Sequence, residues 1–507
     1  MAKQYDVVVI GAGNGGLISA AVCAKAGLST LLLEKHNIPG GCATSFRRGR
    51  FEFEVSLHEL CDYGPDDNPG DVRKLFEGLG AQIQWIPVPD TFRAIIPGPS
   101  GYDVTMPVGR QNFIDRMESY VPGSRPSMID FFALIDDVRK AMDYTAANAG
   151  KADPEVMKRD HPNFLKAGAY SVNKVLKALK IPKKAQDILA TYWGYLGADA
   201  DTLSFVHYSR MLDLYLERSP YIPKNRSHEI SLALEKRVRD FGGDVWYNTE
   251  ATRILTEGGR VCGVEVKGKK IPCKRVISNV IPHVVYANMM DESVIPTAEI
   301  KKANAREFGS RGFVVYLGLN KSAEELGIKD YTVFLTDYAD SVKNRKSMGS
   351  IASNNMQATN CLNVINPDAS PAGTSIIYIT SIYTEDAWRN VAPENYFKVK
   401  NQLARRFVEG YEKAAGIKIS DYIEEAEVST PLTFARYLGT PQGTIYGYLA
   451  QSWDGLLQRL QTMYTENTVP GLRFCGGHSV RLLGYSSSYL SGDLAAKLTM
   501  KDIKEGA

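Results

Sequence analysis

The stretch VVVIGAGNGGLISAAVCAKAGLSTLLLEKH, residues 7–36, constrains the fold more than any other part of the chain. It is apolar enough to resemble a membrane anchor, but Lys25 interrupts it, and four of the six positions from 11 to 16 are glycine. Each glycine weakens a helix by roughly 1 kcal/mol relative to alanine. The preceding MAKQYD is scarcely basic, and no small-residue cleavage site follows. We therefore expect neither a signal peptide nor a transmembrane helix here.

The same stretch is typical of a strand, a tight turn, a helix and a second strand. Residues 5–10 are β-branched and apolar, as in a strand buried on both faces, and residues 17–26 are helix formers. Gly27 lies where a helix C-cap belongs, and residues 29–33 form a second strand that ends at Glu34. The pattern predicts a βαβ unit.

The glycines of this unit occupy the positions of a GxGxxG motif. Gly11 permits the tight turn, Gly13 lets a phosphate approach the backbone, and Gly16 lets the helix pack on the strand. A pyrophosphate is then expected at the helix N-terminus, where free N–H groups and the helix dipole favour an anion. Glu34, 18 residues after Gly16, is placed to accept hydrogen bonds from a ribose. The motif predicts dinucleotide binding, and a glycine-rich turn in some other α/β protein is the alternative.

Composition narrows the remaining possibilities. The 507 residues exceed one compact domain, so we expect two or three closely packed lobes. The formal charge is only +3, with no dominant basic run, which gives no electrostatic support for nucleic-acid binding. The seven cysteines are scattered without CxxC or zinc-like spacing, which predicts a reduced cytosolic chain with no metal site.

Several segments resemble one flavoprotein family, in that family's order. EKHNIPGGCATSFRRGRFEFEVSLHEL (34–60) is similar to the segment after the first βαβ unit of the FAD-dependent phytoene desaturase, carotenoid isomerase and retinol saturase group, within the wider amine-oxidase-like flavoproteins. The other segments that resemble this family are 161–176, 192–205, 231–282, 430–449 and the closing motif at 470–498. Together they cover most of the chain.

The resemblance implies an α/β fold in which a Rossmann-like FAD lobe of amine-oxidase or glutathione-reductase type is interleaved with a mixed α+β substrate lobe. The implied FAD lobe comprises residues 1–90, 225–295 and 455–507, and the implied substrate lobe comprises 91–224 and 296–454. No second GxGxxG motif is present, so we expect no separate NAD(P) domain and leave the electron partner open.

The implied FAD contacts combine the glycine motif with the family's other cofactor positions. They are Gly11, Gly13, Asn14, Gly15, Gly16, Glu34, Lys35, Gly40, Gly41, Cys42, Thr44, Ser45, Ala251, Asn279, Gly476, Gly477, Gly484, Tyr485 and Ser486. A helix beginning at Tyr485 would direct its N-terminus toward the electron-rich flavin.

Four departures from the family pattern leave the flavin pocket open to question. Gly477 stands where many relatives have an acid, and a run of glycines has become Leu482-Leu483-Gly484. The usual FDxG reads Phe53-Glu54-Val55-Ser56, and the glycine pair before the adenosine helix reads Arg226-Ser227.

The family's chemistry is hydride transfer between flavin N5 and a hydrophobic polyene or isoprenoid, as desaturation, saturation or cis/trans isomerisation. Candidate residues near such chemistry are His58, His478 and Tyr446, with Glu59 and Asp62 as weaker candidates. Each histidine has the alternative of being a core residue. Tyr437, Tyr446 and Tyr448 either line a substrate channel or are ordinary strand aromatics.

Two other functions and a membrane contact stay open at this stage. The first alternative is an FAD amine oxidase-like enzyme acting on a small polar substrate, and the second is a flavoprotein subunit without turnover. The helix-rich stretch 113–190 has apolar residues at helical spacing, such as Met128 and Phe132, which face either a core or a lipid surface. The expected location is the cytoplasm, with peripheral contact at the cytoplasmic membrane face.

Overall fold

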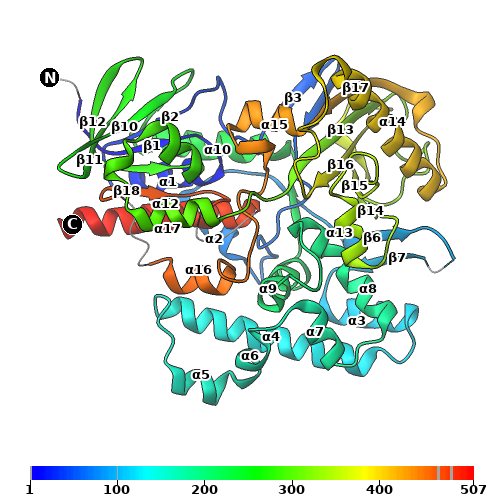
Figure 1. The fold of residues 1–507 in the computed structure, drawn as a ribbon. Coiled ribbons are helices and arrows are strands. Elements are labelled where there is room, and N and C mark those ends of the chain that lie inside the picture. Colours follow the sequence, from blue (N-terminus) through cyan, green and yellow to red (C-terminus); the bar gives the residue numbers. More distant parts are fainter. Residues whose placement is uncertain (1–2, 100, 465–468, 480–483, 507) are drawn as a thin grey trace.

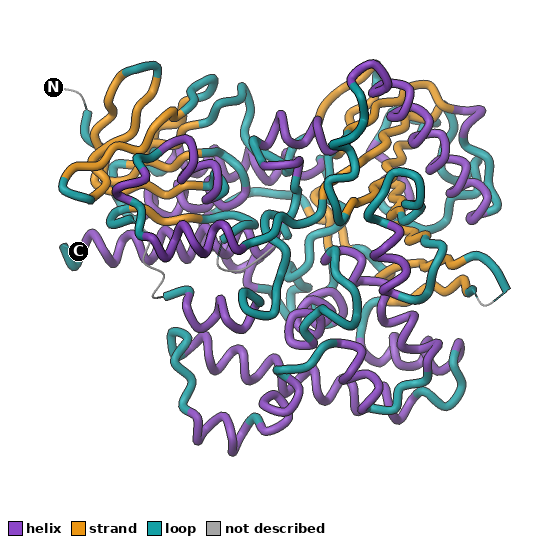
Figure 2. The backbone as a smooth tube through the Cα atoms, viewed as in Figure 1, coloured by secondary structure: helices purple, strands orange, loops and turns teal. Residues whose placement is uncertain are grey.

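The computed structural model describes residues 3–99, 101–464, 469–479 and 484–506. Two large sheets stand side by side, and a layer of helices lies below them (Figure 1). The strands concentrate in the two upper regions, whereas the lower region is helical (Figure 2). The predicted α/β class, with a Rossmann-like lobe interleaved with an α+β lobe, is confirmed.

The first sheet contains the predicted βαβ unit at its centre. Strands β9, β2, β1, β12 and β18 run parallel, and β10 and β11 extend the sheet as antiparallel hairpins. The bounds are β1 (Tyr5–Ile10), β2 (Thr30–Leu33), β9 (Asp244–Trp246), β10 (Ala251–Glu257), β11 (Arg260–Val266), β12 (Lys269–Ser278) and β18 (Leu472–Phe474). Because helices cover it, its central strands are almost wholly buried.

Three helices pack beside this sheet: α1 (Asn14–Lys25), α10 (Arg226–Asp240) and α17 (Tyr485–Lys504). Helix α1 begins three residues before the predicted start, because Gly13 serves as its N-cap and the following glycines are helical. Helix α17 approaches α1 closely at Gly492, where a Cβ would lie 2.3 Å from the Gly15 carbonyl oxygen. This contact anchors the closing motif against the glycine-rich turn.

The second sheet has the strand order β17, β13, β16, β15, β14, β6, β7 and is antiparallel except between β14 and β6. Its strands are β6 (Asp90–Ile96), β7 (Tyr102–Pro107), β13 (Arg311–Leu319), β14 (Thr332–Leu335), β15 (Gln357–Cys361), β16 (Ser375–Tyr383) and β17 (Ile423–Ser429). Helix α14 (Tyr396–Ala415) shares a core with one face, and the hairpin β3 (Ser45–Arg48) and β4 (Phe51–Glu54) packs on the other.

The helical layer forms its own core beneath the second sheet. It contains α3 (Arg110–Tyr120), α4 (Arg125–Ala147), α5 (Pro154–Asp160), α6 (Pro162–Ala167), α7 (Val172–Ala178), α8 (Lys183–Leu189), α9 (Phe205–Leu216) and α16 (Leu456–Thr462). The apolar stripe of α4 that includes Met128 and Phe132 is buried in this core. That stripe therefore faces protein and is no membrane-binding face.

Shorter elements complete the chain: α2 (Asp71–Leu79), β5 (Trp85–Pro87), β8 (Tyr221–Pro223), α11 (Pro282–Val284), α12 (Thr297–Ala305), α13 (Ser341–Ser347) and α15 (Pro431–Leu438). The five-segment division into FAD and substrate lobes stays a prediction. In the part of the chain that the structure describes, no helix is long and apolar enough to cross a membrane.

Candidate functional site

A cavity of about 740 Å³ opens between the two sheets and the helical layer. One end is lined by the glycine-rich turn, residues 34–36 and the closing motif. The other end is lined by residues 56–62 and by side chains of α4, α9 and α16. Its size suits a large organic cofactor or ligand.

The glycine-rich turn and the closing motif meet around the side chain of Asn279. A Cβ on Gly13 would lie 2.5 Å from Asn279 Nδ2, and a Cβ on Gly476 would lie 2.5 Å from Asn279 Oδ1. A Cβ on Gly15 would lie 2.5 Å from the backbone nitrogen of Gly476. Real Cβ contacts are not this short, so only glycine fits at these positions, and the backbone of both loops directly contacts the Asn279 amide.

Two helix N-termini line this end of the cavity without side-chain caps. Helix α1 begins after Gly13 and helix α17 after Gly484, and neither N-cap residue makes a side-chain hydrogen bond. The N–H groups of a first helical turn have no intrahelical partner, and the helix dipole adds positive potential there. Both ends are therefore suited to an anionic or electron-rich group.

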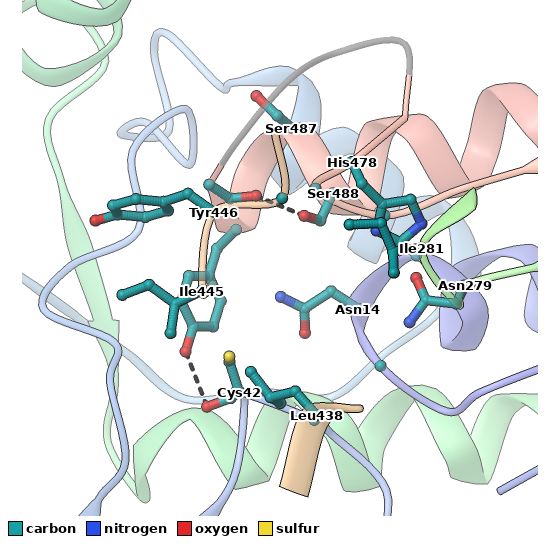
Figure 3. Close-up of a pocket in the computed structure, with 18 of the residues that line it drawn as sticks. Asn14, Cys42, Asn279, Ile281, Leu438, Ile445, Tyr446, His478, Ser487 and Ser488 are labelled. Carbon is teal, nitrogen blue, oxygen red and sulfur yellow. Dashed lines mark hydrogen bonds between the residues drawn. The ribbon is translucent and has the colours of Figure 1, made fainter. Parts of the chain in front are cut away.

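Polar atoms at this end lack protein partners. Asn14 Oδ1 is buried and has no hydrogen-bond partner in the described ranges, and its amide points into the space between Asn279 and Tyr446 (Figure 3). Buried polar atoms are rarely left unpaired in proteins, so Asn14 awaits a donor from a bound group. The bare turn, the two helix ends and Asn14 together fit a dinucleotide.

Glu34 lies at the end of β2, as the motif predicts. It is buried, and its carboxylate oxygens accept hydrogen bonds from the backbone nitrogens of Ala12 (2.7 Å) and His36 (2.8 Å). Each oxygen keeps a free lone pair that can accept from a ribose hydroxyl. The neighbouring rim is formed by Lys35, which is exposed, and by His36, whose Nε2 lies 2.6 Å from the Tyr437 carbonyl oxygen.

Most of the predicted cofactor residues line the cavity. The lining ones are Gly11, Gly13, Asn14, Gly15, Glu34, Lys35, Gly40, Gly41, Cys42, Ala251, Asn279, Gly476, Gly477, Gly484, Tyr485 and Ser486. Gly40 also forms a backbone bridge with Gly13, and the Tyr485 hydroxyl donates to the Cys42 carbonyl at 2.9 Å. The structure thus brings four separate chain segments to one end of one cavity.

Three predicted residues do not line it. Gly16 serves packing, because a Cβ there would lie 1.9 Å from the Gly11 carbonyl oxygen. The Thr44 hydroxyl lies 3.2 Å from His228 Nδ1, and the Ser45 hydroxyl donates to Glu52 at 2.6 Å. Both side chains contact neighbours outside the cavity lining, and Thr44 and Ser45 stay predictions as cofactor contacts.

Two of the four departures from the family pattern contact each other. Glu54 is buried and accepts hydrogen bonds from the Ser227 nitrogen and hydroxyl, each at 2.7 Å. It also accepts from the nitrogens of Ser56 (3.2 Å) and Leu57 (3.0 Å). The carboxylate therefore caps the start of α10 and fixes the loop that follows β4. Of the other departures, Gly477 lines the cavity, and Leu482-Leu483 lie outside the described residues.

The predicted catalytic candidates all line the cavity, and the histidines are neutral. His58 Nε2 lies 3.0 Å from the Thr380 hydroxyl, and burial lowers the pKa of His58 to about 4. Burial, helped by nearby arginines, lowers the pKa of His478 to about 3, and its Nε2 has no hydrogen-bond partner among the residues described. Burial raises the pKa of the Tyr446 phenol, which stays protonated. None of the three is an ionised group at neutral pH.

The tyrosines of residues 437–448 do not form one stack. Tyr437 is exposed at the rim and contacts His36, while Tyr446 lies within the cavity (Figure 3). Tyr448 is buried, and its hydroxyl lies 2.7 Å from His283 Nδ1, so it belongs to the scaffold.

One face of α9 contributes residues that the sequence reading passed over. His207, Arg210, Met211, Leu214 and Tyr215 line the far end of the cavity. Their spacing of three and four residues is that of one helical face, which a periodicity search would have found. Among the described residues, no group of three or more His, Cys, Asp or Glu is arranged to hold a metal.

Comparisons with known proteins agree with this geometry. A family model described as an NAD(P)-binding Rossmann-like domain matches residues 9–79. All-trans-retinol 13,14-reductase of Danio rerio is 24% identical over 478 residues, covering 88% of this chain and 78% of that protein. The rat (Rattus norvegicus) protein of the same name is 28% identical over 356 residues, covering 66% of this chain and 58% of that protein. Chloroplastic prolycopene isomerase of Daucus carota is 23% identical over 498 residues, covering 94% and 77%.

Solved structures share the fold at low identity. An oxidoreductase from Methanosarcina mazei superposes with a TM-score of 0.66 at 15% identity, covering 98% of this chain and 100% of that one. Cyclohexylamine oxidase from Brevibacterium oxydans superposes with a TM-score of 0.64 at 14% identity, covering 99% and 100%.

The fold and the site define an oxidoreductase built on the fold of the amine oxidases, with a nucleotide-binding Rossmann-like lobe. Within that class, its homologues are retinol reductases and prolycopene isomerases. These homologues are consistent with the phytoene desaturase, carotenoid isomerase and retinol saturase-like family that the motifs indicated.

Proposed function

We propose that this protein binds FAD and reduces, oxidises or isomerises a hydrophobic polyene or isoprenoid. The observation that carries the proposal is one continuous cavity with a bare phosphate turn at one end and a helix-lined chamber at the other. Homologues named retinol reductase and prolycopene isomerase support a polyene substrate.

In this proposal each end of the cavity has its own task. The N-terminus of α1 and the bare turn would hold the diphosphate, the N-terminus of α17 would face the flavin, and Glu34 would accept from the ribose. A bound flavin would supply hydride transfer at N5. The chain's own contribution is to orient an apolar substrate between α4, α9 and α16 and to exclude water from it.

The experiment starts from the purified chain loaded with FAD. We expect a yellow protein whose flavin spectrum bleaches with dithionite under argon and recovers when a polyene such as a retinoid or carotenoid is added. Product mass then separates saturation, desaturation and isomerisation. Recovery with oxygen alone would favour an amine oxidase-like enzyme, and a colourless chain without affinity for FAD would favour a non-catalytic subunit.

We further propose that the helical layer contacts the cytoplasmic face of a membrane, from which a lipid-soluble substrate enters. The residues that would contact it are exposed basic and apolar side chains of α6 to α8: Leu165, Lys166, Tyr170, Lys174, Lys177, Lys180, Lys183 and Lys184. Clustered lysines next to exposed apolar side chains suit an anionic lipid surface.

Flotation with vesicles tests this contact. The chain should float with vesicles that contain anionic lipid and less so with zwitterionic ones, and changing Lys177, Lys180 and Lys184 to Glu should release it. A chain that stays in the bottom fraction with both vesicle types contradicts the contact.

A further inference from the structure

The loop between β4 and α2 is held rigidly against the second sheet. The Tyr316 hydroxyl donates to the Val55 carbonyl and the Tyr378 hydroxyl to the Leu57 carbonyl, each at 2.8 Å. The Tyr331 hydroxyl donates to the next carbonyl, that of His58. Three tyrosines thus fix the backbone that carries Glu59 into the cavity.

Glu59 and Glu54 lie in the same region of the chain but differ in how many hydrogen bonds their carboxyl groups accept. Both are buried, with relative exposures of 5% and 2%. Glu54 accepts four hydrogen bonds, three of them from backbone nitrogens, and these bonds stabilise its carboxylate against the burial that raises its pKa. Glu59 Oε2 has no hydrogen-bond partner among the described residues, although it is buried in the wall of the cavity.

Among the residues that the structure describes, the Glu59 carboxyl has one hydrogen-bonding contact, and this contact is weak. The Tyr192 hydroxyl lies 3.4 Å from Glu59 Oε1, but it donates to the Thr91 carbonyl at 2.7 Å. A hydroxyl has a single proton, so the longer contact receives little of it. An ionised carboxylate without donors in a buried site is costly, and Glu59 is therefore held as the neutral acid.

Within the described part of the chain, no cation near Glu59 offsets this preference. Tyr331 and Cys61 lie near Glu59, and burial keeps both protonated by raising their pKa values, that of Cys61 to about 12. Asp62 is 3.7 Å from Arg218 and is itself largely buried, with a pKa raised to about 6. Across the cavity, Arg210 is paired with Asp213 at 2.6 Å, and burial keeps His207 neutral by lowering its pKa to about 4.

We propose that Glu59 is the proton donor to a carbon–carbon double bond of the substrate. This rests on the proposed function, since the two-electron donor is the reduced flavin named there. The carboxyl O–H bond breaks and its proton forms a C–H bond at one alkene carbon, while hydride from the reduced flavin forms a C–H bond at the other. The alkene is reduced, the flavin is oxidised, and the Glu59 carboxylate regains a proton from solvent.

The assignment also bears on the direction of reaction. The protonated form of Glu59 is the form that donates a proton to an alkene carbon, whereas desaturation needs the ionised form to receive one. A Glu59 that is protonated at neutral pH therefore favours saturation, and the redox state of the flavin sets the net direction.

The decisive variants are E59Q and the matched control E412Q. Glu412 is also buried, but its Oε1 accepts from the nitrogens of Ile419 (2.8 Å) and Ser420 (2.7 Å), far from the cavity lining. With the FAD-loaded full chain, we expect E59Q to retain flavin and to lose saturation of a retinoid by about 100-fold or more. E412Q should keep the wild-type rate.

Infrared difference spectra of the same proteins provide a readout that needs no turnover. The wild type should show the carbonyl stretch of a protonated carboxyl group that titrates near pH 8, and this band should vanish in E59Q but persist in E412Q. A wild type without that band, or an E59Q chain that still shows it, overturns the proposal. If E59Q folds poorly, the titration of the wild-type carbonyl band still tests whether a buried carboxyl is protonated at neutral pH.

The rate measurement separates two failures. An active wild type alongside an equally active E59Q contradicts only the role of Glu59. A wild type that converts no polyene in either redox state contradicts the proposed function itself.

Discussion

Asn279 shows at the scale of single residues why the glycines around it are needed. Its side chain occupies the space that a Cβ on Gly13 or Gly476 would take, and its backbone nitrogen donates to Ile10 at the end of β1. The amide therefore links the first strand, the phosphate turn and the closing motif. Any side chain added to these loops must displace it or the backbone beside it.

Replacing Gly15 with alanine tests this packing. The new Cβ would lie 2.5 Å from the Gly476 nitrogen, so we expect a loss of about 1–3 kcal/mol in unfolding free energy and loss of bound FAD. Urea denaturation and the flavin-to-protein absorbance ratio measure both effects. The matched control is G78A in α2, where no atom lies within 4 Å of the new Cβ and stability should stay equal or rise. A G15A chain that keeps its flavin and stability would contradict the geometry.

Glu59 also has a measurable effect on stability. Its folded pKa is raised to about 8 by burial, so the stabilisation it gives is complete below pH 4.5 and is lost as pH rises toward 8. Glutamine does not ionise, so the E59Q chain does not lose stability as the pH rises. We expect wild type and E59Q to be equally stable at pH 4, and E59Q to be more stable by about 4 kcal/mol at pH 8. Equal stability at both pH values would contradict a protonated Glu59.

At the scale of elements, a buried charge cluster joins three segments. Asp454 accepts from Arg306 at the end of α12 (2.7 and 2.9 Å) and from Arg459 of α16 (2.6 and 3.0 Å). Arg459 also donates to the Ser479 carbonyl in the closing motif at 2.7 Å. The cluster thus holds α12, α16 and the closing motif together beside His478.

Breaking this cluster should be costly. In D454N two buried arginines lose their counter-charge, and we expect a loss of about 3–5 kcal/mol in unfolding free energy at pH 7. Despite its burial, the hydrogen bonds from Arg306 and the charge of Arg459 lower the pKa of Asp454, so its stabilisation is present near neutral pH and is lost as pH falls below about 4. D368N, at an exposed residue 3.6 Å from Lys224, is the control and should leave stability unchanged. A D454N chain as stable as D368N would refute the account.

The elements that the sequence predicted well are those with local signals. The first βαβ unit follows from its apolar runs and its glycines. The start of α10 at Arg226 depends on Glu54, which accepts from Ser227 and lies 173 residues away along the chain. Such a cap has no local signal. The lining face of α9 did have one, in the spacing of His207, Arg210 and Leu214.

At the scale of the whole molecule, the cavity exists only because distant segments meet. Its walls combine residues near positions 11, 58, 207, 279, 446 and 477, from both sheets and the helical layer. The family resemblance predicted that these segments converge. The resemblance did not predict which buried polar groups lack hydrogen-bond partners. Whether such a group finds a partner depends on tertiary contacts, such as the hydrogen bond from the Tyr192 hydroxyl to the Thr91 carbonyl.

A ligand that spans this cavity should stabilise the entire fold. We expect FAD at 100 times its dissociation constant to add about 2.7 kcal/mol to the free energy of unfolding and to raise the melting temperature measured by circular dichroism. Riboflavin lacks the diphosphate and should give a much smaller shift. Equal shifts with both compounds would mean that the phosphate turn contributes nothing.

The most direct test is a crystal structure of the chain loaded with FAD. The account predicts electron density for the diphosphate against the backbone of residues 11–16, with a ribose hydroxyl within hydrogen-bonding distance of Glu34. Density for the flavin elsewhere, with that turn empty, would contradict it.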